Sequence, residues 1–425
     1  MSAHIIASEN NSITIQVTVQ ISNSMLFSEE SILEAVNNVG NLASQEILKS
    51  FDTDGSAIMI GSSKWISKGQ EIKAYQTPYG EISIPRHVYQ SSKGGKTYCP
   101  LESNARIVVT STPRFAKIVS NKYANLASTK VQVDLAENHG RKVARSYLQN
   151  LSEAVGSVAL AKLEDWHYTT PKLNEPVKTI SIGVDGTCML LCKDGYREAM
   201  VGTISLYDKE GERQHTINIG ATPEYGKSTF WQRMKREIAQ VKTMYPQAIY
   251  IGIADGAKDN CSFLKQHTDK QTLDFYHATG YLKAVAVAAF PRSKEKQRLW
   301  LDTKCHELKH IPGTAENIFD EMKTLKKKKL SKVAQDNLDS SITYFKNHKS
   351  EMNYAKSIKE NLPIGSGVTE AACKTLVKQR LCQSGMKWIE KGAGIVLSLR
   401  ALVLTKGRWE QFWDKINQYG LPILA

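Results

Sequence analysis

Two apolar segments that each run directly into an Asp-Gly pair constrain the fold of this 425-residue chain more than any other feature. Residues 179–184 are followed by Asp185-Gly186, and residues 248–254 are followed by Asp255-Gly256. Short apolar runs bounded by turn residues predict β-strands. The sequence therefore predicts two strands with an acidic side chain at the end of each.

The chain between these strands has the pattern of antiparallel hairpins. Residues 187–192 are expected to form a second strand that turns at residues 193–195. Residues 197–207 are expected to form a third strand, which turns at residues 208–211 toward an extended piece ending near Gly220. Asp-Gly pairs and similar turns between alternating runs are typical of such hairpins.

A helix is predicted over residues 228–244, which carry one apolar face before Pro246 ends the helix; this face consists of Phe230, Met234, Ile238 and Val241. Since crossover connections are right-handed, the strand after this helix should lie parallel to the first one and beside it. A third parallel strand is expected at residues 273–276, leading into a helix at 278–290.

Hairpin strands, a crossover helix and parallel strands together predict an α/β fold with a mixed sheet of the RNase H kind. In that sheet Asp185 and Asp255 lie on adjacent strands at the same edge. Carboxylates that converge in this way are what two-metal phosphoryl transfer requires.

A third carboxylate is expected from Glu370. The Gly365-Ser366-Gly367 segment, with Ser366 or Thr369 as a possible cap, starts a helix just before this acid. Small Ala371 and Ala372 would let the helix lie close to the sheet, and Lys374 and Lys378 follow on the same face as the acid. Such lysines suit a site that DNA approaches.

The regions outside the sheet are expected to be α+β and helical. Residues 1–125 have α+β texture, with an amphipathic helix at 28–51 and strand-like pieces at 81–89 and 105–111. Residues 126–175 are expected to be helical, residues 291–361 to form a basic α-helical insertion with 16 Lys and Arg against 10 Asp and Glu, and residues 362–425 to supply the last helices of the sheet domain, near 368–381 and 389–405.

Residues 132–148 fit a helix-turn-helix loosely. Gly140 would form the turn, and Arg141, Lys142 and Arg145 would lie on a second helix facing the major groove of DNA. His139 and Arg141 occupy positions where apolar contacts are usual. An ordinary helical pair that packs two halves of the chain together fits equally well.

The charge of the chain favours a polyanionic partner. Its 56 Lys and Arg exceed its 42 Asp and Glu, which gives a net charge of +14 and a pI near 9.2. Cations that neutralise DNA phosphates release condensed counterions, so such an excess promotes binding. No apolar run approaches the ~20 residues that span a bilayer, so no membrane association is expected. The seven cysteines form no CxxC pair, and no secretion signal opens the chain, which is typical of a reducing cytoplasm.

Several segments from about Lys178 onward resemble the DDE transposases of bacterial insertion sequences, most closely the Mutator-related ISKra type. They are Val184-Asp185-Gly186-Thr187, Ile253-Ala254-Asp255-Gly256, Asp274-Phe275-Tyr276-His277, Gly365-Ser366-Gly367 with Glu370-Ala371-Ala372-Cys373-Lys374, and Gly385-Met386-Lys387-Trp388. The last has Lys where the family more usually has Arg.

The resemblance implies an RNase H-like core with a helical insertion before the last acid. Asp185, Asp255 and Glu370 would bind two Mg²⁺ ions, for which Mn²⁺ would substitute, and His277 would lie near the scissile phosphate. A core histidine at a strand end is an equally good interpretation of His277, and a buried aromatic is a better one for Trp388 than stacking on an unpaired base.

The implied partners are the terminal inverted repeats of a transposon and target DNA, held by a homodimer or larger assembly at the bacterial nucleoid. The DNA contacts are expected from eight residues: Arg141, Lys142, Arg145, Lys374, Lys378, Arg380, Lys387 and Trp388.

Three other functions stay open on the sequence. Residues 221–228 match a relaxed P-loop, although Pro223 and Glu224 are unfavourable for a phosphate-binding nest. A DNA-binding regulator derived from a transposase would keep the basic surface without cutting. A nuclease or junction resolvase of the same fold would cut without joining.

Overall fold

The computed structural model describes residues 2–9, 12–327 and 330–421. The chain forms two compact units. One runs up to Trp166 and includes Ser398–Val403 and the residues from Arg408 onward; the other consists of His167–Leu397 and Leu404–Gly407. This division differs from the predicted boundaries, because the first unit extends past residue 125 and also contains the C-terminal helix.

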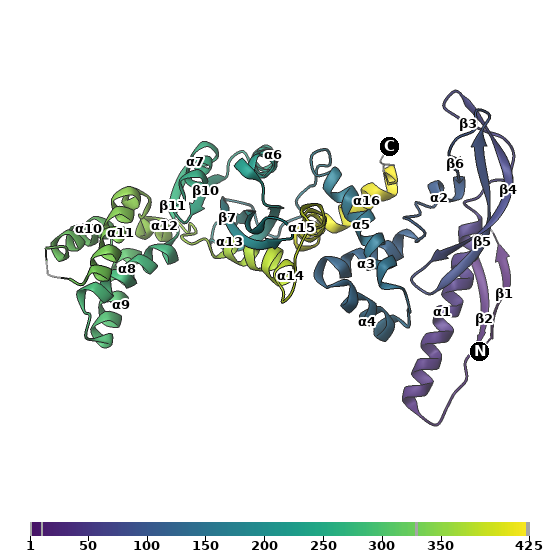
Figure 1. Cartoon of the computed structure of the whole chain (residues 1–425), viewed down its shortest axis with the longest axis horizontal. Coiled ribbons are helices and arrows are strands. Elements are labelled where there is room, and N and C mark those ends of the chain that lie inside the picture. Colours follow the sequence, from purple (N-terminus) through teal and green to yellow (C-terminus); the bar gives the residue numbers. More distant parts are fainter. Residues whose placement is uncertain (1, 10–11, 328–329, 422–425) are drawn as a thin grey trace. The chain divides into compact units, whose positions relative to one another are not determined.

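The second unit is built on a five-stranded mixed sheet (Figure 1). Its strand order is β11-β10-β7-β8-β9. The strands are β7 Thr179–Leu191, β8 Gly195–Tyr207, β9 Arg213–Ala221, β10 Ile249–Ala254 and β11 Lys270–Leu273. β7, β8 and β9 are antiparallel, whereas β10 runs parallel to both β7 and β11. The α/β class, the mixed sheet and the placement of β10 beside β7 are confirmed.

One prediction about this sheet is wrong, because Asp185-Gly186 is not a turn. β7 continues through both residues, which pair with Val201 and Met200 of β8. At Gly186 the side chain of Glu198 from β8 occupies the space of a Cβ, which would lie 2.2 Å from its Oε1. The turn comes only after Leu191, so the two strands expected at 179–184 and 187–192 are one.

The core of the sheet lies against α6 Ser228–Met244. The four apolar side chains predicted for the inner face of this helix are at most 1% exposed; they are Phe230, Met234, Ile238 and Val241. They pack with Ile204, Ile217 and other side chains of the antiparallel strands. Leucine- and isoleucine-sized side chains buried in this way contribute roughly 1.5–3 kcal/mol each, so this layer fixes the sheet that carries the acids.

The expected insertion is helical. α8 Phe275–Ala289 leads into α9 Lys294–His310, α10 Thr314–Leu325, α11 Lys332–His348, the short η2 Lys349–Glu351 and α12 Tyr354–Lys359. α8 shares one apolar core with α9, α10 and α11. The chain leaves the sheet and returns to it at one place: Phe275 N donates to Ile364 O at 3.0 Å, and Ser366 N donates to Asp274 Oδ1 at 3.0 Å.

Further helices complete the second unit. α7 Lys258–His267 connects β10 to β11, and η1 Tyr225–Lys227 precedes α6. α13 Gly367–Ala372, the π-helical η3 Cys373–Lys378 and α14 Gln379–Leu381 follow one another without a break, as predicted for 368–381. α15 Glu390–Leu404 is the other predicted helix, and its residues are divided between the two units.

Among the described residues, the first unit contains two small antiparallel sheets and six complete helices, the last of which is α16 Arg408–Tyr419. The strands are β1 Ser2–Glu9, β2 Ser12–Thr18, β3 Ile58–Ile60, β4 Ser63–Gln76, β5 Glu81–Ser91 and β6 Thr97–Tyr98. The helices before α15 are α1 Met25–Lys49, α2 Pro100–Asn104, α3 Pro113–Asn125, α4 Ser128–His139 and α5 Arg145–Ala161. The α+β texture is confirmed, but residues 105–111 form no strand, only isolated bridges.

α16 Arg408–Tyr419 packs with the first unit rather than the sheet. Its Phe412 ring lies 5.7 Å from the ring of Trp166, and Arg106 donates to backbone oxygens of Asn417 and Gln418. No helix in the described ranges has the length and apolar character needed to cross a membrane.

Candidate active site

Three acidic residues lie at the same level on neighbouring parallel strands: Asp185 within β7, and Asp255 and Asp274 directly after β10 and β11. Ile253 of β10 pairs with Gly183 of β7, so two residues further along both strands Asp255 lies level with Asp185. Ala254 pairs with Leu273 of β11, so Asp274 lies level with Asp255. Neighbouring strands are about 4.8 Å apart, and the sheet therefore presents a row of acids at one edge.

Asp185 is held in place because β7 pairs with β8 both before and after this residue. Its Oδ1 accepts from Gly186 N at 2.7 Å, and its Oδ2 accepts from Cys373 Sγ at 3.5 Å. Burial raises the pKa of Asp185, and the negative charge of Asp255 acts in the same direction. No role is predicted for Cys373 from the sequence, although it belongs to the segment that carries Glu370.

Asp255 lies just beyond the end of β10. Its Oδ1 accepts from Ala257 N at 3.0 Å, and its backbone oxygen accepts from the hydroxyl of Tyr344 at 2.8 Å. Gly256 has a φ of +101° and faces the rings of Tyr344 and His348. A glycine is required at this turn because other residues rarely adopt this conformation.

Glu370 is positioned by the close contact of α13 with the sheet. Thr369 lies over Gly183, and its hydroxyl is 2.7 Å from that of Thr203, the β8 partner of Gly183. Ala372 and Cys373 are each 4% exposed, whereas Ala371 is exposed. The predicted close approach of the helix to the sheet is thus confirmed for Ala372. Ala371 does not contribute to it, whereas Gly183 on the sheet leaves space for Thr369.

Asp274 and His277 form a second part of the site. Asp274 is fully buried and caps α8: its carboxylate accepts from the backbone N of Tyr276 and of His277, from Nδ1 of His277 at 3.0 Å and from Ser366 N. Burial alone would raise the pKa of Asp274, but these hydrogen bonds, led by that of His277, lower it. The same hydrogen bond raises the pKa of His277.

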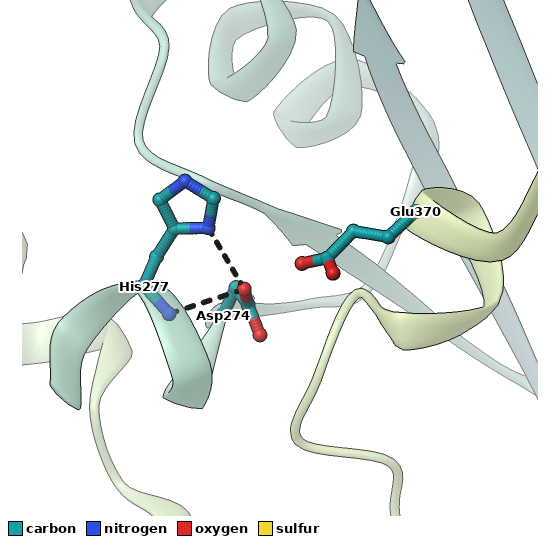
Figure 2. A group of neighbouring side chains, drawn as sticks. All are labelled: Asp274, His277 and Glu370. Carbon is teal, nitrogen blue, oxygen red and sulfur yellow. Dashed lines mark hydrogen bonds and ion pairs between the residues drawn. The ribbon is translucent and has the colours of Figure 1, made fainter. Parts of the chain in front are cut away.

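The carboxylate of Glu370 turns toward this pair (Figure 2). Among the described residues, Asp274, His277 and Glu370 are the group of potential metal ligands whose donor atoms all lie within 4.8 Å of one another. Asp274 is poorly suited to bind an ion, because its oxygens already accept four hydrogen bonds. Its role is to fix the start of α8, the ring of His277 and the Gly-Ser-Gly turn.

The predicted triad of Asp185, Asp255 and Glu370 is therefore brought to one edge but not gathered into a single ligand cluster. Glu370 borders the same hollow as Asp185 and Cys373. Like charges repel, so the long Glu370 side chain is more stable beside the imidazole of His277 than beside two other carboxylates. Its Oε1 also accepts from Ser366 Oγ at 3.0 Å, which favours the observed orientation.

The hollow beside Asp185 has a volume of about 590 Å³ and a basic wall. Lys374 and Lys378 are both exposed and both line it. The prediction that these lysines share a face with the acid is confirmed. They give the acidic edge the positive charge that a phosphate backbone needs.

Two other residues expected to contact DNA are engaged within the protein. Arg380 is 2% exposed, and its guanidinium lies 5.3 Å from the centre of the Trp388 ring. Trp388 donates from Nε1 to Leu381 O and pairs through its backbone with β7. Trp388 is only partly buried, so the prediction of a buried aromatic holds in part, whereas Lys387 is exposed.

The helix-turn-helix prediction is wrong for two of its three basic residues. Gly140 does end α4 in a left-handed conformation, but α5 begins only at Arg145, so Arg141 and Lys142 lie in the connection. Arg141 is 7% exposed, donates to Gln76 Oε1 at 2.6 Å and lies over the ring of Phe115. Its guanidinium therefore supports packing, while Lys142 and Arg145 are exposed.

In the segment that matches a relaxed P-loop, an acidic side chain accepts the hydrogen bonds at the start of the helix. The carboxylate of Glu224 accepts from Thr229 N at 2.8 Å and from the Thr229 hydroxyl at 3.0 Å. Lys227 Nζ is 2.6 Å from Glu198 Oε2. An acidic side chain thus takes the place of the anion that such a helix start would bind.

Asp274 belongs to the candidate site but is not among the residues predicted for it, although it lies in the segment that carries His277. Its signal was present: like Asp255, it directly follows a strand, and it is an acid at the N-cap of a helix. In comparisons with known proteins, no family model matches the chain and no curated protein matches it.

Proposed function

We propose that the chain is a DDE transposase, an enzyme that cuts DNA at transposon ends and joins the released 3′ ends to target DNA. The observation that carries the proposal is the level alignment of Asp185 and Asp255 on adjacent parallel strands, with Glu370 bordering the same hollow as Asp185. The strand order, three antiparallel strands followed by two parallel ones, supports an RNase H-like fold. The sequence resemblance points the same way.

The donor set suits divalent cations. Asp185, Asp255 and Glu370 offer carboxylate oxygens, the ligands that Mg²⁺ and Mn²⁺ take in proteins. The negative charge of Asp255 helps to raise the pKa of Asp185 because the two carboxylates repel each other. A bound cation would relieve this repulsion. Two bound ions would activate the attacking oxygen and stabilise the leaving oxygen.

The chain's own residues position the DNA around this edge. Lys374 and Lys378 attract the phosphate backbone from the side of Asp185. His277, held by Asp274, places a positive charge beside the acids when protonated. The proposal implies a dimer or larger assembly in the bacterial cytoplasm, because two transposon ends have to be held together. The geometry at Glu224 and Lys227 disfavours an ATPase.

A cleavage assay on DNA from both flanks of the gene tests the proposal. With Mg²⁺ the chain should cut this DNA, and Asp185→Asn and Glu370→Gln should each reduce cutting about 10³-fold or more, since metal-ion catalysis contributes several kcal/mol. Both variants should still bind the DNA. Glu390→Gln, an exposed acid changed in the same way at the start of α15, is the control that should cut normally.

Cutting by Asp185→Asn at the rate of the unmodified chain would refute the assignment of the acids. A second arm supplies DNA with an already cut 3′ end. Joining of that end to a target plasmid distinguishes a transposase from a nuclease or resolvase, and loss of all cutting with intact binding would indicate a regulator.

A further inference from the structure

Glu370 borders a second hollow, which Lys374 and Lys378 do not line. This hollow has a volume of about 510 Å³ and lies between α8 and α11. His277 and Glu370 stand at the acidic site, while Tyr276, Tyr281 and Gly280 of α8 form one wall. The volume is within the ~300–1,000 Å³ typical of sites for small organic groups.

The two hollows beside Glu370 differ in chemistry. The one next to Asp185 presents lysines, which suit phosphates, and it contains no aromatic side chain among its lining residues. The one between α8 and α11 presents aromatic rings and neutral polar groups, and Glu370 is its one acid. A nucleotide straddling Glu370 would thus find a basic surface for its backbone and an aromatic surface for its base.

The walls of the α8–α11 hollow suit a flat, uncharged group with hydrogen-bonding edges. The side chain of Tyr276 is 67% exposed at its mouth. Tyr281 is stacked on Tyr344 with 3.8 Å between ring centres, which fixes the ring in place. Asn337 and Ser340 of α11 are exposed and line the other wall with groups that both donate and accept hydrogen bonds.

The α8 wall also leaves space for a guest. At Gly280 an added Cβ would meet no atom within 4 Å. A glycine in a helix interior is unfavourable relative to alanine, and here no packing contact within the described residues requires it. Any other side chain at this position would reduce the hollow.

We propose that the α8–α11 hollow receives an unstacked base of the DNA strand that is cut at the acidic edge. The inference rests on the proposed function and adds to it a base-binding site next to the scissile phosphate. Taking a base out of the helix lets the backbone approach the acids, and stacking on an aromatic side chain compensates for the lost stacking in DNA. Stacking of this kind tolerates any of the four bases, so the site would admit a base without reading sequence.

Filling the hollow tests the inference. Gly280→Leu projects a branched side chain into it, and Val287→Leu, at a 41% exposed position of α8 outside the hollow, is the matched control. On DNA cut by the unmodified chain, Gly280→Leu should cut about 5- to 150-fold more slowly, the range expected for losing one stacked base. Val287→Leu should cut at the normal rate.

Substrates that lack one base provide the decisive arm. DNA with an abasic nucleotide is prepared for each of the positions flanking the cut. At one of them, the missing base should restore cutting by Gly280→Leu to the rate of the unmodified chain, because nothing then needs the hollow. Ser340→Leu, which fills the hollow from α11, repeats the measurement if Gly280→Leu does not fold.

The outcomes separate the two proposals. If the unmodified chain cuts no DNA, the proposed function fails. If it cuts, but the filled variants cut intact DNA equally fast, or no abasic position restores their cutting, the base-binding site is refuted while the proposed function stands.

Discussion

The contact between α13 and the sheet predicts a large effect from a single methyl group. Replacing Gly183 by alanine places a Cβ 2.0 Å from Oγ1 of Thr369 and 3.2 Å from Oγ1 of Thr203. Ordinary contact begins at 3.4 Å, so α13 has to move by roughly 1.4 Å, the difference between the two distances, or Thr369 has to change rotamer.

The expected loss of stability follows from two terms. Overpacking of a filled core costs roughly 1–3 kcal/mol, and separating the two threonine hydroxyls costs roughly 0.5–1.5 kcal/mol. Gly183→Ala should therefore lower the free energy of unfolding by about 1.5–4.5 kcal/mol. Cutting should fall about 10²-fold, because Glu370 follows Thr369 directly and displacements near 1 Å have such effects on catalysis.

Two further variants make the test specific. Gly220→Ala changes a glycine of β9 whose added Cβ would lie 3.7 Å from Leu397, and it should leave stability unchanged or raise it by up to about 1 kcal/mol. Thr369→Ala removes the clashing oxygen. Combined with Gly183→Ala it should be less destabilising than the sum of the two single changes, as expected for residues in contact.

Stability is measured by urea titration, with hydrogen exchange of the β7 and β8 amides as the reporter. This reporter is specific to the second compact unit. If Gly183→Ala proves as stable as Gly220→Ala, or if Thr369→Ala gives no compensation, the close packing of α13 on β7 is not what positions Glu370.

Three other outcomes are expected. Arg380→Ala should lose about 2–4 kcal/mol of stability through a cavity and the lost contact with the Trp388 ring; unchanged stability with weaker DNA binding would show instead that Arg380 contacts DNA. Lys122 lowers the pKa of Asp134, so the contribution of this ion pair to stability is present above about pH 4 and is lost as pH falls through the lowered pKa. The difference in urea midpoint between the unmodified chain and Asp134→Asn should therefore shrink toward acid pH. A difference that widens toward acid pH would contradict this. Lys227→Ala should leave DNA cutting intact, and equilibrium dialysis should detect no ATP bound to the unmodified chain; ATP binding that depends on Lys227 would restore the P-loop interpretation.

The strands of the sheet and the positions of its acids could be predicted from the sequence where the hydrophobic periodicity is strong. The apolar face of α6 and the apolar run of β10 identify those elements by themselves, and the crossover rule then places Asp255 beside Asp185. The extent of β7 was not accessible, because an Asp-Gly pair signals a turn and only the pairing with β8 shows that the ladder continues.

Exposure was harder to anticipate than secondary structure. The amphipathic helix predicted at 28–51 exists as α1, yet its apolar residues Ile32, Val36 and Ile47 are 47–55% exposed. Arg141 and Arg380 are predicted to contact DNA, but contacts within the protein bury both side chains. The orientation of Glu370 depends on Ser366 and His277, a balance of charges that spacing along the chain does not encode.

The hydrogen bonds that join Phe275 to Ile364 and Asp274 to Ser366 hold together the two ends of the helical insertion. A loop whose ends are already together can change length at small entropic cost, since each doubling adds only about 0.6 kcal/mol. Growth, shrinkage or exchange of this lobe during evolution would therefore leave the spacing of Asp185, Asp255 and Glu370 untouched. Chains that share this acidic edge should differ most in the helices inserted between Phe275 and Ile364.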